Sequence, residues 1–354
     1  MFIEESCLVF DVGSSSIKSG ISGDEKPTLI IPSCIGSLQN SKSNEKYISK
    51  KIYEKHDIFE INYPIKRGII ENWDDFESLI SFSFEKLETD PSTIPVVFSE
   101  SPKNSTKQNS KIYELMFEKF NVKGFYMENS GNLVGYAAGR TSSFVLDSGE
   151  GISFCQGSHQ GSVIESTLSI ENFGGLDVTN YLRSLIFDEK TLHQTQMIKE
   201  NFCKISKNFE ESKSDGFKEE IFILPDKTLL SMGFEPFMAS ELLFQPDLFD
   251  LHSSGFHQMI SDSILTIDDE NHQQLMLNNI VLSGGNCCFD GLENRLLNEL
   301  EKLFPNLTVQ FVDFSKEDRK ILTWIGCSIV GCLPNYQEII MKSKSKYEEI
   351  GYIL

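Results

Sequence analysis

Short apolar runs that end in polar, glycine-containing turns recur along the chain. Residues 8–10 are apolar and lead into the turn Asp11-Val12-Gly13-Ser14, and residues 144–146 lead into a similar turn at 147–151. Because glycine permits backbone angles that other residues avoid, each run predicts a buried strand followed by a tight turn. Apolar residues resume at Ile152 and Phe154, which predicts a β-hairpin. The same design in both halves favours two related lobes.

A third apolar run, residues 280–282, ends in Ser283-Gly284-Gly285 and is followed by a helical pattern. Apolar residues then recur every three or four positions from Phe289 to Leu303, which predicts a helix over 289–303 that Pro305 closes. Similar spacing predicts helices over 76–87 and 112–120. Strands and helices therefore alternate in both halves, and we expect an α/β fold. The polar, Lys- and Ser-rich residues 38–58 lack this periodicity and predict a mobile surface element.

Length and composition indicate a folded chain with more than one core. The 354 residues exceed what one hydrophobic core usually serves, and 40% of them are hydrophobic. The net charge of −20 disfavours direct binding to nucleic acids or to anionic membranes, because both normally rely on clustered Lys and Arg. The eight cysteines include no Cys-x-x-Cys pair, and the N-terminus is acidic where a signal peptide would be basic. We therefore expect an intracellular protein with reduced, structural cysteines.

The two Asp-x-Gly turns suit a nucleotide with bound magnesium. Glycine amides and the hydroxyls of residues 14–16 can cradle phosphate oxygens, while Asp11 and Asp147 hold a hydrated cation. Lys18 can balance phosphate charge. One such turn alone is more often a plain hairpin, but two of them with a third Gly-Gly turn favour a ligand site. The sequence contains no Gly-x4-Gly-Lys-Ser/Thr loop, which excludes a Walker-type phosphate site.

Collinear motifs run through nearly the whole chain. They are residues 11–18, 63–65, 68–69, 72–75, 136–140, 147–151, 199–200, 243–246, 281–285, 324–326 and 328–329. Together they resemble the actins and actin-related proteins, which share their wider fold with sugar kinases and the heat-shock chaperone ATPase. The resemblance implies a duplicated ribonuclease-H-like α/β fold, the actin fold, with two lobes and four subdomains around a nucleotide cleft. The implied subdomains are 1–32, 64–137 and 322–354 (first), 33–63 (second, small and mobile), 138–173 and 253–321 (third), and 174–252 (fourth).

The resemblance also implies a ligand, ATP or ADP with Mg²⁺, and the residues that contact it. The implied phosphate contacts are Gly13, Ser14, Ser15, Lys18, Gly149, Glu150 and Gly151. Asp11 and Asp147 fall on the positions that hold the hydrated metal. The implied adenosine pocket comprises Lys199, Glu200, Gly284, Gly285, Phe289 and Lys320, with Phe289 in place of the family's usual tyrosine. For Lys199, Glu200 and Lys320 a solvated salt-bridge face is the alternative interpretation.

Two departures from the family concern the attacking water. Actins position it with a glutamine and a histidine, whose places are taken here by Ser130 and Phe154. Because phosphoryl transfer to water depends on orienting the nucleophile, we predict nucleotide binding without efficient hydrolysis and assign no catalytic residue. The alternative is that Ser130, Asn129 or Asn132 holds the water. Glu150 is one methylene longer than the family's aspartate.

The surfaces for polymerisation differ from the family as well. The 38–58 stretch is shorter than the loop that actins insert into a neighbour, and Asp250 replaces a glycine. The groove that actins offer to partner helices keeps its matching residues, namely Tyr136, Gly139, Ile325, Ile329, Leu333 and Ile339. A partner helix in this groove is one interpretation, and core packing is the other for Ile325 and Ile329.

Three hypotheses follow from the resemblance. The first is a divergent actin-related protein that serves as a structural or regulatory subunit of a cytoskeletal or chromatin-remodelling assembly, with actin or other actin-related proteins as partners. We expect it in the cytoplasm and at the cytoskeleton, with the nucleus as the other location. The second is a filament-forming actin with ATPase-coupled polymerisation. The third is a small-molecule kinase, which needs a carboxylate base; the only candidate in the sequence is Glu150.

Overall fold

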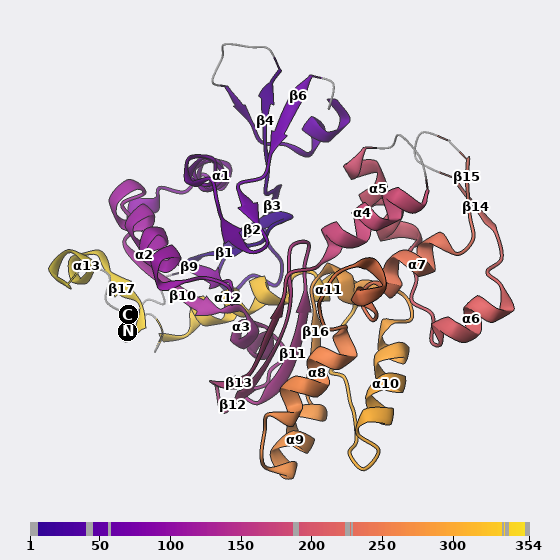
Figure 1. Ribbon diagram of the computed structural model, residues 1–354. Helices are drawn as coiled ribbons and strands as arrows, with labels where there is room; N and C mark the ends of the chain where they lie inside the picture. The colour runs from indigo at the N-terminus through magenta and orange to yellow at the C-terminus, as the bar shows by residue number, and fades with distance from the viewer. Residues whose placement is uncertain are drawn as a thin grey trace. The chain divides into compact units, whose positions relative to one another are not determined.

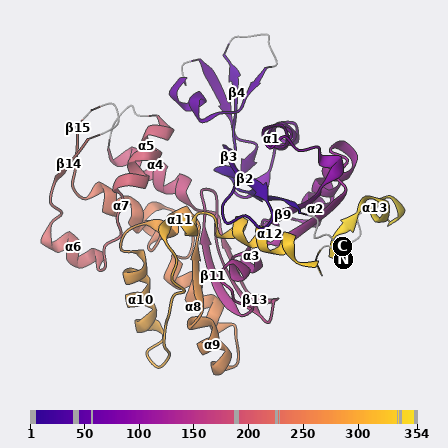
Figure 2. The same cartoon turned by 180° about the vertical axis from the view of Figure 1, so that it is seen from behind.

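The structure is a computed structural model that describes residues 6–39, 45–55, 58–186, 191–223, 227, 229–334, 336 and 340–350. The chain divides into two compact units (Figures 1 and 2). The first comprises residues 1–141 and 321–354, and the second comprises residues 142–320. Within the described residues, no helix is long and apolar enough to cross a membrane.

The first unit is built on a six-stranded sheet with the order β17-β10-β9-β1-β2-β3. Its strands are β1 (Leu8–Val12), β2 (Ser16–Ile21), β3 (Leu29–Pro32), β9 (Pro95–Glu100), β10 (Gly124–Asn129) and β17 (Lys342–Ser343). β1 pairs antiparallel with β2 and parallel with β9, and β9 is also parallel to β10. The carboxyl ends of β1, β9 and β10 therefore meet at one edge of the sheet.

Helices and two smaller sheets complete the first unit. The helices are α1 (Trp73–Lys86), α2 (Thr106–Glu114), α3 (Ser130–Ala137), α12 (Leu322–Cys332) and α13 (Lys344–Ile350), with short turns η1 (Lys50–Lys55), η2 (Pro91–Thr93) and the π-helical η3 (Leu115–Lys119). The smaller sheets contain β4 (Ile35–Leu38), β5 (Lys46–Tyr47) and β6 (Phe59–Asn62), and β7 (Ile65–Lys66) and β8 (Ile69–Ile70). The predicted helix over 76–87 is confirmed in α1. The predicted helix over 112–120 is found as the end of α2, which widens into the π-helical turn after Glu114.

The polar stretch 38–58 contributes regular structure to this unit where it is described. Residues 45–55 include β5 and η1, and Ile52 is buried against Gly36 of β4. Lys46 Nζ lies 2.7 Å from a carboxylate oxygen of Asp75 at the start of α1. The stretch is thus attached to the unit at both a buried side chain and an ion pair, and its mobility stays a prediction.

The second unit repeats the design around a four-stranded sheet with the order β13-β12-β11-β16. Its strands are β11 (Ser143–Ser148), β12 (Ser153–His159), β13 (Ser162–Glu171) and β16 (Ile280–Ser283), with a separate hairpin of β14 (Glu220–Ile223) and β15 (Leu229–Met232). β11 pairs antiparallel with β12 and parallel with β16, as β1 pairs with β2 and β9. The hairpin predicted after residues 144–146 is confirmed. The strand and turn predicted at residues 8–14 are confirmed as well, and they belong to a second hairpin.

Eight helices accompany the sheet and the hairpin in the described part of the second unit. They are α4 (Gly175–Leu185), α5 (Leu192–Phe202), α6 (Phe209–Asp215), α7 (Glu235–Glu241), α8 (Phe256–Leu265), α9 (Glu270–Leu277), α10 (Leu292–Leu303) and α11 (Lys316–Arg319), with short turns η4 (Pro246–Phe249) and η5 (Gly285–Cys288). The predicted start of a helix at Phe289 is wrong. Phe289 is extended and Gly291 is left-handed (φ 89°), so that α10 begins only at Leu292.

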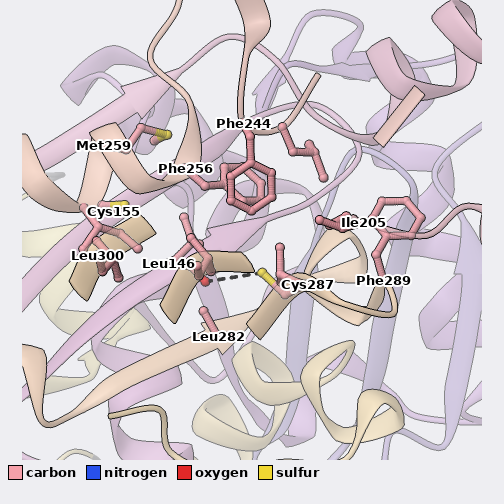
Figure 3. Packing of buried hydrophobic residues seen from close by; sticks show 14 of the residues in the cluster. Leu146, Cys155, Ile205, Phe244, Phe256, Met259, Leu282, Cys287, Phe289 and Leu300 are labelled. Carbon is pink, nitrogen blue, oxygen red and sulfur yellow. Dashed lines mark hydrogen bonds between the residues drawn. The ribbon is translucent and has the colours of Figure 1, made fainter. Parts of the chain in front are cut away.

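The core of the second unit lies between the sheet and these helices. Figure 3 shows Leu146 of β11 and Leu282 of β16 in one apolar cluster with Phe244 and Phe256. Cys287 joins them, and its Sγ donates to the carbonyl oxygen of Leu146 at 3.8 Å. This packing fixes β11 and β16 beside each other directly below the turns that follow them.

Candidate functional site

The first candidate site is the turn of the β1–β2 hairpin. Asp11 and Lys18 face each other in the antiparallel register, and Lys18 Nζ lies 2.7 Å from Asp11 Oδ2. The hydroxyl of Ser99, from the end of β9, donates to Asp11 Oδ1 at 3.1 Å. Asp11 therefore has a cationic side chain on one carboxylate oxygen and a hydroxyl donor on the other.

The tip of this first loop is held by two neighbouring segments. Ser33 donates from its hydroxyl to the Gly13 carbonyl (2.6 Å) and from its amide to the Ser15 carbonyl (3.0 Å). The amide of Gly68, in the β7–β8 turn, donates to Ser14 Oγ at 3.1 Å. The loop conformation is thus set by contacts that the sequence analysis missed, although Gly68 stood in a recognised motif.

The second candidate site is the turn of the β11–β12 hairpin, residues 148–152. Asn286 of η5 donates from Nδ2 to Ser148 Oγ (2.9 Å) and to the Gly149 carbonyl (2.8 Å). The first amides of α4, from Gly175 and Leu176, donate to the carbonyls of Gly149 (2.9 Å) and Glu150 (3.0 Å). This loop is therefore held by two elements far away in sequence.

The predicted third glycine turn packs directly on this second loop. Gly284 is left-handed (φ 88°), and a Cβ atom there would lie 2.3 Å from the carbonyl oxygen of Ser148. Both the conformation and the close approach require glycine. By contrast, an added Cβ at Gly149 or Gly285 would meet no atom within 4 Å. The backbone at these two glycines is thus open to a ligand.

Of the predicted adenosine residues, the structure places Lys199 beside the second loop. Its Nζ donates to the Gly175 carbonyl at 2.8 Å and lies 3.4 Å from Glu150 Oε2. Glu200 and Lys320 are exposed: Glu200 accepts from Gln196 at 2.9 Å, and Lys320 pairs with Glu317 at 3.6 Å. These two side chains have the contacts of a solvated face.

Phe289 lies at the edge of the second unit's core. It is 9% exposed and belongs to the apolar cluster shown in Figure 3. Its ring therefore packs against protein on most of its surface.

The residues at the two water positions differ in what they can do. Ser130 begins α3 and donates its hydroxyl to the Glu100 carbonyl at 2.6 Å. Phe154 faces Asp147 across the hairpin, is 2% exposed, and has no polar atom in its side chain. Where the first hairpin sets Lys18 opposite its aspartate, the second sets this phenyl ring.

The alternative water holders serve the start of α3. Asn129 caps the helix by accepting from the Asn132 amide (3.1 Å), and Asn132 Nδ2 donates to Glu128 Oε1 at 3.2 Å. Burial raises the pKa of Glu100, and the charge of Glu128 raises it further against the opposing hydrogen bond from Asn109. The polar side chains at the ends of β9 and β10 thus hydrogen-bond to one another and to the start of α3.

The predicted partner groove is in part exposed. Ile329 and Leu333 are 37% and 41% exposed, whereas Ile325 packs on the buried cluster around Trp324. Tyr136 accepts a hydrogen bond from the Tyr336 hydroxyl at 3.3 Å, and burial raises its pKa. Of the other two predicted groove residues, Gly139 is left-handed with no neighbour near an added Cβ, and Ile339 lies outside the described residues.

A divalent cation beside the aspartates of the hairpin turns would be coordinated mostly by water molecules and by phosphate oxygens of a bound nucleotide. Across the described ranges, no three His, Cys, Asp or Glu side chains gather as a set of metal ligands. Mg²⁺ usually keeps several waters and binds one or two carboxylates together with ligand phosphates. Asp11, whose two oxygens already accept from Lys18 and Ser99, fits contact through such waters.

Comparison with protein families gives one match that covers both units. The family model described as Actin matches residues 3–195 and 187–354. The two matched segments together run from residue 3 to the last residue and include both hairpins and the third glycine turn.

Proposed function

Because the chain belongs to the actin family, we propose that it is a divergent actin-related protein that binds ATP or ADP with Mg²⁺ and hydrolyses ATP slowly. The supporting observation is the repeated hairpin. Each unit has an aspartate at the end of its first strand, a glycine-containing turn held by several hydrogen bonds, and a parallel strand beside it. Such turns present backbone amides to phosphate oxygens.

The proposed phosphate contacts lie in both turns. Gly13, Ser14, Ser15 and Lys18 serve from the first loop, and Gly149, Glu150 and Gly151 from the second. Asp11 and Asp147 hold the hydrated cation. When bound, Mg²⁺ neutralises part of the phosphate charge. Preformed hydrogen bonds on the loops reduce the conformational entropy that binding would otherwise cost.

The proposed adenosine contacts come from the third glycine turn and from α5. The open backbone at Gly285 leaves space for a ligand close to the second loop. With Gly284, the remaining members of the set are Lys199, Glu200, Phe289 and Lys320. Glu200 and Lys320 have only exposed ion-pair or amide contacts in the structure, so that they can turn to a ligand at little cost.

Slow hydrolysis follows from Ser130 and Phe154. Ser130 already donates to the Glu100 carbonyl, and Phe154 is buried and cannot hydrogen-bond. Neither side chain provides the two-point orientation of a water molecule that phosphoryl transfer requires. The nucleotide would then act as a stabilising ligand rather than as a timer.

We place the protein in a larger actin-containing or actin-related assembly, as a structural or regulatory subunit in the cytoplasm, with a nuclear chromatin-remodelling assembly as the other setting. Exposed Ile329 and Leu333 beside Tyr136 offer apolar anchors to a partner helix. The net charge of −20 argues against direct contact with nucleic acids or anionic membranes.

The first experiment identifies the nucleotide released when freshly purified protein is denatured. Close to one ATP per chain supports binding with slow hydrolysis. ADP in protein that was loaded with ATP and kept free of ADP would contradict slow hydrolysis. If no nucleotide is released and calorimetry with Mg-ATP shows no heat of binding, the proposed function is wrong.

A matched variant and a pelleting assay complete the test. Asp11→Asn removes one charge from the first loop, and we expect the purified variant to release little nucleotide on denaturation. A change at exposed Lys26 should leave the amount of released nucleotide unchanged. Polymer that pellets after addition of magnesium and salt would favour a filament-forming actin over a subunit of a larger assembly.

A further inference from the structure

Glu150 and Lys199 form an ion pair at the second loop. The side chain of Lys199 is 4% exposed and that of Glu150 is 20% exposed, and the closest approach of ammonium and carboxylate is 3.4 Å. Lys199 is also anchored by its 2.8 Å hydrogen bond to the Gly175 carbonyl. The ammonium is therefore fixed by the start of α4, and the carboxylate reaches it from the loop.

The bare Cα of Gly175 makes room for this pair. A Cβ atom there would lie 2.6 Å from Glu150 Oε2, 2.8 Å from Lys199 Nζ and 3.1 Å from Asn286 Oδ1. Three side chains from the loop, from α5 and from η5 thus converge over one glycine. Because Asn286 also holds the loop backbone, the position of the pair is coupled to that of the loop.

The charge of Glu150 is a problem for a phosphate loop. The phosphate contact proposed for Glu150 is made by its backbone amide, between those of Gly149 and Gly151, whereas its side-chain carboxylate repels the ligand. Lys199 offsets that charge and holds the carboxylate against α4. An aspartate, one methylene shorter, would not reach the ammonium from the same backbone position.

Resting on the proposed nucleotide binding, we propose that Lys199 is a positioning residue that acts through Glu150. By neutralising the Glu150 carboxylate and holding it over Gly175, Lys199 sets the preference of the site for phosphorylated nucleotides over the nucleoside. The contact of Lys199 with adenosine, included in the adenosine set above, is a second role of this side chain. If that contact were its main role, a change at Lys199 would weaken the binding of adenosine and of ATP equally.

Isothermal titration of nucleotide-free protein with adenosine, ADP and ATP in the presence of Mg²⁺ separates these roles. Lys199→Met should lower the affinity for ATP about 10-fold or more and the affinity for ADP by less, because the repulsion by Glu150 scales with ligand charge. The affinity for uncharged adenosine should fall by no more than about 3-fold. The double variant Glu150→Gln with Lys199→Met should restore ATP affinity to within about 3-fold of the parent. Lys302→Met, which removes an exposed lysine of the same unit, should change none of the three.

As a control, thermal unfolding of each nucleotide-free variant shows whether that variant is folded. If Lys199→Met alone does not fold, Lys199→Arg and the double variant carry the test, since both avoid an unpaired Glu150. Equal loss of adenosine and ATP affinity in a folded Lys199→Met, or no restoration by Glu150→Gln, would overturn the inference and leave the proposed function standing. A parent protein that binds no nucleotide overturns both.

Discussion

The two hairpins share one backbone design but balance their carboxylates differently. In the first, Asp11 pairs with Lys18 from the facing strand, seven residues away. In the second, the position facing Asp147 is Phe154, which carries no charge. The positively charged side chain is that of Lys199 in α5, and it pairs with Glu150 in the turn, 49 residues earlier in the chain. The first loop therefore carries its own counter-charge, whereas the second depends on a helix that must pack beside it.

The two loops also differ in how tightly they are enclosed. Ser33 and Gly68 hold the first loop by hydrogen bonds. The second is held by Asn286 and by α4, and in addition the glycine turn at Gly284 touches its backbone. A close backbone approach such as that of Gly284 leaves less room for an added side-chain atom than hydrogen-bond contacts do, because backbone cannot change rotamer.

The largest expected effect compares Gly284, in the glycine turn that packs on the second loop, with Gly13 in the first loop. Gly284→Ala introduces a Cβ 2.3 Å from a carbonyl oxygen at φ 88°, and we expect it to lower the free energy of unfolding by more than about 4 kcal/mol. At Gly13 the nearest atom would be at 3.2 Å, and Gly13→Ala should cost only about 1 kcal/mol. Urea denaturation measures both, and equal costs would contradict the difference in enclosure.

The next effect tests the internal counter-charge of the first loop. Lys18→Met leaves Asp11 with only its Ser99 hydrogen bond and should weaken Mg-ATP binding about 100-fold. Calorimetric titration measures the affinity. Lys26→Met, at an exposed lysine of the same unit, serves as the control. An unchanged affinity in Lys18→Met would show that this lysine does not face phosphate.

The rate of ATP hydrolysis should depend on residue 154, which faces Asp147 in the second hairpin where Lys18 faces Asp11 in the first. The double change Ser130→Gln with Phe154→His supplies two groups able to orient water and should raise the single-turnover rate of ATP hydrolysis about 10- to 100-fold. Phe154→Leu with Ser130→Ala is the matched control, with no gain expected. If the two double variants hydrolyse ATP equally, these positions do not limit the reaction.

The smallest expected effect is on the free energy of unfolding when a polar side chain that holds one of the loops is removed. Asn286→Ala removes one buried and one partly buried hydrogen bond and should lower the free energy of unfolding by about 1–3 kcal/mol, and Ser33→Ala by about 1 kcal/mol. Urea denaturation again provides the measurement. A larger loss in Ser33→Ala would reverse the order of dependence inferred for the two loops.

Sequence patterns predicted the strands, the tight turns and the third glycine turn, because each depends on local signals. The actin fold followed instead from the resemblance of collinear motifs to a known family. The α10 boundary was missed because Phe289 continues the helical spacing, while the backbone break at Gly291 leaves no hydrophobic signal. The four-subdomain division and the ligand contacts stay predictions. Ser99, Ser33 and Asn286 could not be assigned from the sequence, since each acts through a partner brought close only by folding.

What the sequence by itself determined is the pair of Asp-x-Gly turns, because a glycine that follows an apolar run is a local signal. The pairing of Asp11 with Lys18 was found only in the structure. Only the tertiary structure decided which side chains hold those turns. Asn286 is 137 residues from Gly149, and Lys199 is 49 residues from Glu150. Such contacts depend on how helices pack on the sheet, and packing is a property of the whole unit rather than of any short segment.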